Sequence, residues 1–472
     1  MKRLASIAAA LALAGCQSGP SFGPARSAVL SEAQGAESKG QDDTGALPYM
    51  RGGAAVRALD TTGAGKISHV VFIVQENRSF DNLFQGYPGA DTVASGKDSK
   101  GETLQLKPKG LGYKVSIDHS AEAMFESCDG TGKLPGTDCK MDGFDLEQSF
   151  PSPFNHPQYD YVPQTDSKPY FDMAHEWVLA DKTFASELDE SFVAHQYLIA
   201  GQAAWSVNLP TNQWWGCGGG RFNWIETITK DRNTSGGKIK PCYEYQTLGD
   251  ELDKAKLSWR FYAAAFGKDS NTAGGTWSAY RAVKHIYDGP DWKNDVISPN
   301  WKFITDVRAG TLANVTWITP VCPDSDHTNC GGGRGPSWVA ALVNTIGKSK
   351  FWKSTAIFVI WDDWGGLYDH VPPPYADRDG LGFRVPLLVI SPYAKHGHVS
   401  HVPYETASLP RFAEDLFGLS PLAAADKRAN SPAKDCFDFS QQPRPFVKIA
   451  APLAPRFFMH KHNDDYFIPD YE

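Results

Sequence analysis

Short apolar runs, separated by polar stretches, predict strands that are buried on both faces. The runs are only four to six residues long and are rich in β-branched and aromatic residues, which is typical of strands inside a parallel sheet. They span residues 69–74, 315–318, 355–360 and 385–390. Helical three- and four-residue spacing of apolar positions marks residues 248–257, 338–346 and 409–416. This alternation predicts an α/β fold with a mostly parallel central sheet and helices on both faces.

Polar side chains follow each of these predicted strands. Carboxylates, amides or imidazoles occupy residues 76–81, 324–327, 362–363 and 396–401. In open α/β sheets, ligands bind beyond the carboxyl ends of the strands. We therefore expect all four groups to lie at the same end of the sheet and to form a site there.

Two long segments interrupt the alternation of strands and helices. Residues 91–169 and 214–243 are rich in Gly, Pro, Lys and Asp, which predicts long loop insertions over the carboxyl ends of the strands. No internal repeat or second linker follows residue 67. The sequence therefore predicts one catalytic domain over residues 67–472.

The N-terminus has the pattern of a targeting segment. Lys2 and Arg3 precede an apolar stretch, residues 4–13, that is too short to span a membrane. Leu13-Ala14-Gly15-Cys16 resembles a bacterial lipoprotein cleavage box, which predicts a signal peptide over residues 1–15 and lipidation of Cys16. Ordinary secretory cleavage near the same point is the alternative. Residues 16–66, rich in Gly, Ala and Ser, are expected to form a flexible tether.

Charge and cysteine content agree with an exported protein whose main partner is not nucleic acid. The net charge is −8 and, since residues 1–15 carry Lys2 and Arg3 but no acid, −8 − 2 gives −10 after cleavage. This acidic balance argues against a nucleic-acid partner. Export favours disulfides between cysteines that are close in sequence, and no C-x-x-C spacing indicates structural zinc. The candidate pairs are Cys128 with Cys139, Cys217 with Cys242, and Cys322 with Cys330, which leaves Cys436 unpaired.

The residues after the first and third predicted strands suit a hard divalent cation. Glu76, Asn77, Asp362 and Asp363 provide three carboxylates and one amide oxygen. Without a cation, three neighbouring carboxylates would repel one another, and one would be driven to bind a proton. The alternative is an ion-pair network built on Arg78.

Several motifs together resemble one family. They are Glu76-Asn77-Arg78-Ser79-Phe80-Asp81, Met141-Asp142-Gly143-Phe144, residues 362–373 (DDWGGLYDHVPP) and Gly382-Phe383-Arg384-Val385-Pro386. They resemble the bacterial phosphoesterases that include phosphocholine-type phospholipases C and the respiratory-burst-inhibiting acid phosphatase. The resemblance extends over residues 67–419. It implies an alkaline-phosphatase-like fold, hydrolysis of phosphate esters through a covalent phospho-enzyme, and one divalent metal ion on Glu76, Asn77, Asp362 and Asp363.

The resemblance also implies the roles of further residues. Ser191, just before a helical stretch at residues 193–201, falls at the position of the nucleophile; a serine that merely caps the helix is the alternative. His119, His285 and His327 resemble the family's active-site histidines. His370 follows a family motif, and a structural role for it remains open.

Three functions remain open at this point. Ser191-Phe192-Val193-Ala194-His195 differs from the Thr-x-Pro-Asn-Arg pattern of the phospholipase branch, and residues 404–408 (YETAS) differ from its late Asp-His-Thr-Ser. These differences favour an acid-phosphatase-like enzyme, anchored by lipid in the bacterial cell envelope. The alternatives are a phospholipase C that cleaves lipid headgroups, and a surface lipoprotein that binds phosphorylated ligands without turnover.

Overall fold

A computed structural model describes residues 59–150, 156–188, 190–211, 215–265, 277–460 and 462. These residues belong to one compact unit, residues 45–472. The predicted signal peptide, Cys16 and all but the last part of the predicted tether lie outside the described residues.

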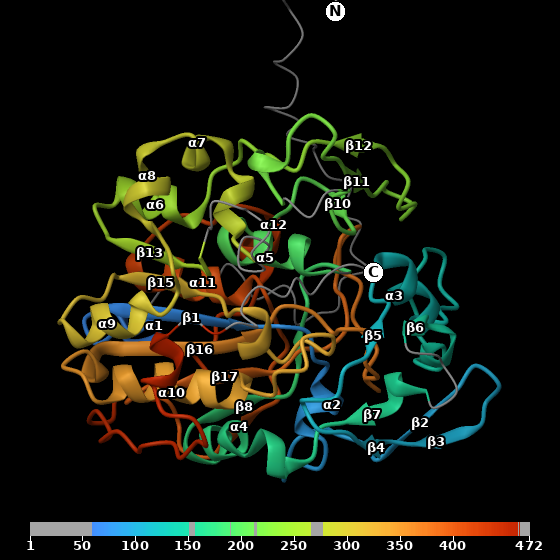
Figure 1. The fold of residues 1–472 in the computed structure, drawn as a ribbon, viewed down its shortest axis with the longest axis horizontal. Helices are drawn as coiled ribbons and strands as arrows, with labels where there is room; N and C mark the ends of the chain where they lie inside the picture. The colour runs from blue at the N-terminus through green and yellow to red at the C-terminus, as the bar shows by residue number, and fades with distance from the viewer. Residues whose placement is uncertain are drawn as a thin grey trace, which may run out of the picture. The chain divides into compact units, whose positions relative to one another are not determined.

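An eight-stranded sheet forms the centre of this unit (Figure 1). Every strand pairs in parallel with its neighbours except β17, which is antiparallel to both of its neighbours. The α/β fold with a mostly parallel sheet is therefore confirmed. In spatial order the strands are β14 (Val296–Ile297), β13 (Trp259–Tyr262), β15 (Val315–Ile318), β1 (His69–Gln75), β16 (Thr355–Trp361), β17 (Leu387–Ile390), β8 (Val178–Ala180) and β18 (His398–Ser400).

The direction of β17 corrects one sequence-based expectation. His401 follows β18, which runs in the same direction as β16, and it contacts Asp181 at the end where β16 finishes. Because β17 runs antiparallel to β16, however, His396 and His398 emerge at the opposite end of the sheet from Asp362. There His398 contacts Asp435. The residues just before β17, including Arg384, lie instead at the end where β16 finishes.

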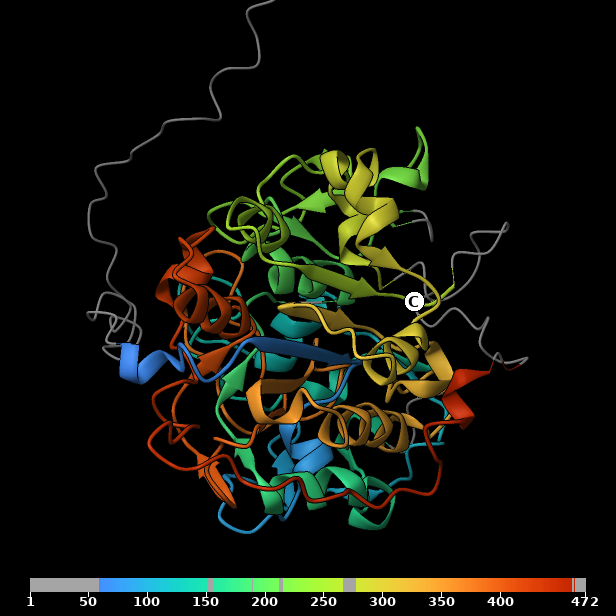
Figure 2. The same ribbon diagram turned by 90° about the vertical axis from the view of Figure 1, so that its left-hand side faces the viewer.

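Helices cover both faces of the sheet, which explains why its central strands are apolar throughout (Figures 1 and 2). On one face Phe358 of β16 packs edge-on against Phe412 of α11 (Ser408–Phe417), and Trp317 of β15 donates a hydrogen bond to the carbonyl of Leu198 in α5 (Ser191–Ala200). On the other face Trp361 packs against Tyr170 of α4 (Gln164–Glu176).

The three helices predicted from apolar spacing are all present. Residues 248–257 contain α6 (Leu248–Lys254), which Thr247 and Asp250 begin with a reciprocal capping box. Residues 338–346 lie within α10 (Gly335–Gly347), and residues 409–416 lie within α11. The other α-helices of the described residues are α1 (Leu59–Thr62), α2 (Phe80–Phe84), α3 (Ala121–Cys128), α7 (Lys284–Tyr287), α8 (Pro290–Asn294), α9 (Lys302–Arg308) and α12 (Ala424–Arg428).

The two predicted insertions form small substructures beside the main sheet, on the right and at the top in Figure 1. The first insertion carries α3 and short strands, and the second forms most of a three-stranded antiparallel sheet. Their strands are β2 (Ser95–Lys97), β3 (Thr103–Gln105), β4 (Lys107–Pro108), β5 (Ser116–Ile117), β6 (Ser149–Phe150), β7 (Asp160–Tyr161), β10 (Ser206–Val207), β11 (Ile225–Thr227) and β12 (Lys238–Ile239). A separate two-stranded sheet joins β9 (Thr183–Phe184) to β19 (Tyr404–Glu405).

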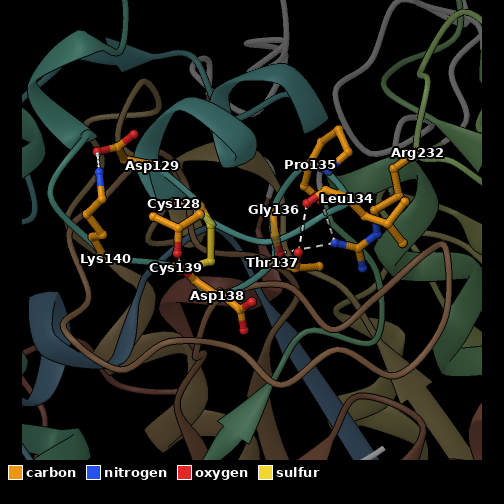
Figure 3. The surroundings of a disulfide bond; sticks show 11 residues. Cys128, Asp129, Leu134, Pro135, Gly136, Thr137, Asp138, Cys139, Lys140 and Arg232 are labelled. Carbon is orange, nitrogen blue, oxygen red and sulfur yellow. Dashed lines mark hydrogen bonds and ion pairs between the residues drawn. A yellow bond between two sulfur atoms is a disulfide. The ribbon is translucent and has the colours of Figure 1, made fainter. Parts of the chain in front are cut away.

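All three predicted disulfides are formed, Cys128–Cys139, Cys217–Cys242 and Cys322–Cys330. Figure 3 shows the first, beside the guanidinium of Arg232, which donates to the carbonyls of Pro135 and Gly136. Cys436 is buried, and burial raises the pKa of its thiol to about 12. None of the helices described in this chain has the length and apolarity needed to cross a membrane.

Candidate active site

Two acidic segments leave adjacent strands at the same point. β1 and β16 are parallel neighbours in a register that pairs Gln75 with Trp361. Glu76 and Asn77 therefore start beside Asp362 and Asp363, and the backbone N–H of Asn77 donates to Asp362 Oδ1 at 3.2 Å. All four side chains are fully buried.

Close backbone approach holds these segments together. Asn77 has a φ of +38°, and Gly365 and Gly366 have φ values of +63° and +70°, a region that non-glycine residues seldom adopt. A Cβ on Gly365 would lie 2.7 Å from the carbonyl oxygen of Asn77, and a Cβ on Gly366 would lie 2.3 Å from Ile117. The glycine pair is required because the turn after β16 packs directly on Asn77 and on the segment that carries His119.

Ser191 lies within hydrogen-bonding distance of this acidic cluster. Its hydroxyl donates to Glu76 Oε2 at 3.0 Å and accepts from Asn77 Nδ2 at 3.2 Å. The same Asn77 amide donates to both carboxylate oxygens of Asp363, at 2.9 and 2.8 Å. Ser191 is the first residue of α5, where backbone N–H groups lack intrahelical partners and the helix dipole favours an anion.

The donor set fits a divalent cation. Asn77 Oδ1 and Asp362 Oδ2 are both buried, and neither has a hydrogen-bond partner among the described residues, a state that is costly for an acceptor that no cation binds. Burial tends to raise the pKa of Asp362, but His195, together with hydrogen bonds with Glu76 and Ser191, outweighs burial and lowers that pKa to about 2. Asp362 is therefore held ionised, as a metal ligand must be.

His119 and His327 lie next to this cluster, with their rings 6.1 Å apart. His119 Nδ1 lies 2.8 Å from the carbonyl oxygen of Ile117, which can only accept, so the ring proton is on Nδ1. His119 Nε2 is then an acceptor, 3.3 Å from Asn77 Nδ2. In His327 the arrangement is reversed, because the N–H of Asn329 donates to Nδ1 and the proton of the neutral ring is on Nε2.

Buried hydrogen bonds hold the segment that carries His327. Tyr170 and Trp361 donate to Asp326 Oδ2 at 2.7 and 3.0 Å, and Arg78 Nε donates to the Asp326 carbonyl at 2.7 Å. Burial raises the pKa of Asp326 to about 6. The guanidinium of Arg78 thus donates hydrogen bonds to the Asp326 carbonyl and to Asn82 Oδ1. Both acceptors lie outside the set of Glu76, Asp362 and Asp363.

The structure does not bring the two remaining histidines into this cluster. His285 lies on α7 and contacts Glu244 and Asp250, with its side chain 37% exposed. His370 Nδ1 lies 2.6 Å from Asp81, and its Nε2 lies 3.1 Å from Asp91. These contacts tie His370 to α2 rather than to Asp363.

A cleft of about 1070 Å³ adjoins the cluster. Its lining includes the neighbours of three candidate catalytic residues, since Asp118 and Ser120 flank His119, Glu190 precedes Ser191, and Asn329 contacts His327. Ser191 and His327 are themselves buried. Each adjoins the cleft lining through its neighbour, Glu190 for Ser191 and Asn329 for His327. The volume is at the upper end of that of small-molecule sites.

Sequence reasoning missed one residue of the cluster, His195. Its Nε2 lies 2.9 Å from Glu76 Oε1 and 3.5 Å from Asp362 Oδ2. A signal was available, because residues four apart on a helix share one face, and His195 is four residues after Ser191 on α5.

A serine at the start of a helix, beside carboxylates that suit a cation and two imidazoles, is the set of groups used by metal-assisted ester hydrolases. The chain belongs to the Phosphoesterase family, whose model matches residues 67–420. The resemblance seen in the motifs is thus confirmed, together with the enzyme class that it implied, the phosphoric ester hydrolases.

Similar proteins are phospholipases C from bacteria and a plant. The non-hemolytic phospholipase C of Pseudomonas aeruginosa is 26% identical over 75% of this chain, which spans only 54% of that protein. Phospholipase C A of Mycobacterium tuberculosis is 26% identical, over 80% of this chain and 77% of its own length. Non-specific phospholipase C1 of Arabidopsis thaliana is 24% identical, over 75% and 68%.

Among solved structures, an alkaline phosphatase superfamily protein from Vibrio parahaemolyticus is similar to this chain. It is 10% identical and has a TM-score of 0.38, over 76% of this chain and 69% of that one.

Proposed function

We propose that this protein hydrolyses phosphate esters by way of a phosphoserine on Ser191. The observation that carries the proposal is the position of Ser191 Oγ, 3.0 Å from Glu76 Oε2 at the start of α5. In the first step Oγ bonds to phosphorus and the bond to the leaving alkoxide breaks. In the second step water attacks the phosphoserine, releasing phosphate and the free serine.

The residues around Ser191 supply the remaining requirements. Glu76 accepts the hydroxyl hydrogen bond and can take the proton. The first N–H groups of α5 would face the phosphoryl oxygens of a phosphoserine on Ser191. Glu76, Asn77, Asp362 and Asp363 would hold one divalent metal ion. Such an ion supplies Lewis-acid stabilisation of negative charge and lowers the pKa of a hydroxyl.

The two histidines are suited to different tasks. His327, with its ring proton on Nε2, can donate to the leaving alkoxide or to a phosphoryl oxygen. His119, with its lone pair on Nε2, can accept a proton from the attacking water. His285 takes no part in this mechanism, because its contacts are with Glu244 and Asp250.

Replacing the nucleophile tests the proposal. Ser191→Ala is expected to lower turnover of p-nitrophenyl phosphate or a p-nitrophenyl phosphodiester by about 10³-fold or more, with the fold retained by circular dichroism. Ser116→Ala, a serine of the cleft lining, is the matched control and should keep full activity. Wild-type turnover in Ser191→Ala would exclude Ser191 as the nucleophile, and absence of turnover in the wild-type protein with every metal tried would favour the ligand-binding lipoprotein.

We also propose that the protein is exported and anchored by lipid on Cys16 in the bacterial cell envelope. Three disulfides support export, since they persist in oxidising compartments. The acidic net charge of −8 supports a partner other than nucleic acid.

A phospholipase C activity is the second candidate, favoured by exposed aromatic side chains at the rim of the cleft. Phe150 lines the cleft and is 78% exposed, while Phe222 is 71% exposed. Thr211, also in the lining, hydrogen bonds to the backbone of Phe222 and Trp224. Arg221 and Lys240 lie over these two rings, at 4.4 and 3.9 Å, a combination of aromatic and basic groups that suits a lipid surface.

Comparing soluble and vesicle substrates separates the two candidates. If the enzyme is a phospholipase C, Phe150→Ser with Phe222→Ser should reduce hydrolysis of phosphatidylcholine vesicles by about tenfold or more and leave turnover of a soluble p-nitrophenyl ester unchanged. Val447→Ser, which replaces an exposed apolar residue of the C-terminal segment, should change neither. If the wild-type protein releases no phosphorylated headgroup from vesicles yet hydrolyses the soluble ester, the phosphatase is favoured.

A further inference from the structure

His195 places a nitrogen ligand among the oxygen ligands of the candidate metal site. Its Nε2 lies 2.9 Å from Glu76 Oε1 and 3.5 Å from Asp362 Oδ2, and all three side chains are at least 98% buried. The three side chains thus offer one nitrogen and two carboxylates that converge on one small volume.

Two acceptor atoms of the acidic cluster lack hydrogen-bond partners among the described residues. Asp362 Oδ2 and Asn77 Oδ1 are buried and accept no hydrogen bond within the described part of the chain. Leaving a buried acceptor without a hydrogen bond or a cation is unfavourable. A cation bound beside His195 would satisfy both atoms at once, which an imidazole N–H directed at Glu76 does not.

The position of His195 is fixed by the helix and not by the metal ligands. α5 is buried along its whole length, and Trp317 Nε1 donates to its Leu198 carbonyl at 3.0 Å. Ser191 and His195 share one face of this helix. The nucleophile and the imidazole are therefore directed at the acidic cluster together.

We propose that His195 is a ligand of the metal, and that this site takes a borderline first-row transition ion such as Zn²⁺ in preference to Mg²⁺ or Ca²⁺. Imidazole suits Zn²⁺ and its neighbours in the series, whereas an all-oxygen set suits Mg²⁺, Ca²⁺ and Mn²⁺. This inference rests on the proposed function, since it takes Glu76 and Asp362 as metal ligands, and it adds the class of ion.

Metal binding to the chelator-treated protein tests this without measuring activity. By calorimetry, His195→Gln should weaken Zn²⁺ binding by about 100-fold and change Mg²⁺ binding by less than about threefold. The glutamine can still donate a hydrogen bond to Glu76 but offers no imidazole nitrogen. His285→Gln is the matched control, because His285 also lies between two carboxylates, and its Zn²⁺ affinity should equal that of the wild type.

X-ray absorption of the Zn²⁺-loaded wild-type protein gives a second measurement that needs no variant. Scattering from one imidazole is expected around the zinc, and it should be lost in His195→Gln. A zinc environment of oxygen only, or equal Zn²⁺ affinity in His195→Gln, would overturn the inference and leave the proposed oxygen ligands standing. If the wild-type protein binds no divalent ion, the metal in the proposed function is refuted as well.

Discussion

His119 and His327 differ in which ring nitrogen carries the proton, and one backbone group sets each tautomer. The carbonyl of Ile117 fixes the proton of His119 on Nδ1, while the N–H of Asn329 fixes that of His327 on Nε2. Two neighbouring imidazoles thus offer one acceptor and one donor without any difference in residue type. A single backbone hydrogen bond at each residue decides which ring nitrogen can donate and which can accept.

At this scale we expect His327→Gln to reduce kcat for a phosphate ester by about 10²–10³-fold, the effect of removing one charge-stabilising donor. His285→Gln should leave kcat within about twofold, because its contacts lie outside the cluster. Steady-state kinetics on both variants, with folding checked by circular dichroism, measures the contrast. Equal losses in the two variants would contradict the placement of the donor at His327.

At the scale of the elements, the antiparallel direction of β17 places the residues before it at the end of the sheet where β16 finishes. Arg384, just before β17, is buried and binds Asp369 at 2.8 Å through Nε and 3.1 Å through Nη2. It also lies 3.6 Å from Asp81 of α2. Asp81, Asp369 and His370 have ligand atoms close enough to hold a metal ion. The Arg384 guanidinium, however, already places a positive charge beside the two carboxylates and links the loop after β16 to α2.

We therefore expect Arg384→Met to destabilise the fold by about 3–5 kcal/mol, because it leaves buried carboxylates without their partner. Arg456→Met, at an exposed arginine, should change stability by less than about 0.5 kcal/mol. Chemical denaturation of both variants gives the comparison. A loss below about 1 kcal/mol for Arg384→Met would show that the ion-pair cluster contributes little.

For the whole molecule, buried carboxyl groups make stability depend on pH. Burial raises the pKa of Asp326 to about 6 and those of Asp160 and Asp379 to about 7, from an ordinary 3.8. Between about pH 4 and pH 7 the folded protein then binds more protons than the unfolded chain, so stability falls as pH rises through that range. The low pKa of Asp362, about 2, adds no change there, since it matters only at more acidic pH.

The thermal midpoint is expected to be higher at pH 5 than at pH 7.5, and Asp379→Asn should reduce the difference. Asp379 is suited to this test because it is buried and accepts a hydrogen bond from Tyr197 of α5 at 2.7 Å. Differential scanning calorimetry across this pH range measures the slope. A midpoint that rises from pH 5 to pH 7.5 would contradict the assignment of these carboxyl groups as neutral when folded.

The sequence by itself determined the strand-forming runs, the α/β class and the meeting of the residues after β1 and β16. These features follow from local patterns, because a continuously apolar run indicates a strand that is buried on both faces. The carboxyl ends of parallel neighbouring strands lie at the same edge of the sheet. The disulfide pairs followed from closeness in sequence.

Only the tertiary structure decided the direction of β17, the separate location of His285 and the contact of His195 with Glu76. A run of four apolar residues reads the same in either direction, so it cannot encode whether the strand runs parallel or antiparallel. The motif context of His285 carried no information about the distance of α7 from the site. His195 reaches Glu76 only because α5 packs on the sheet with Ser191 and His195 directed at the same strand ends, and that packing depends on contacts between residues more than a hundred positions apart.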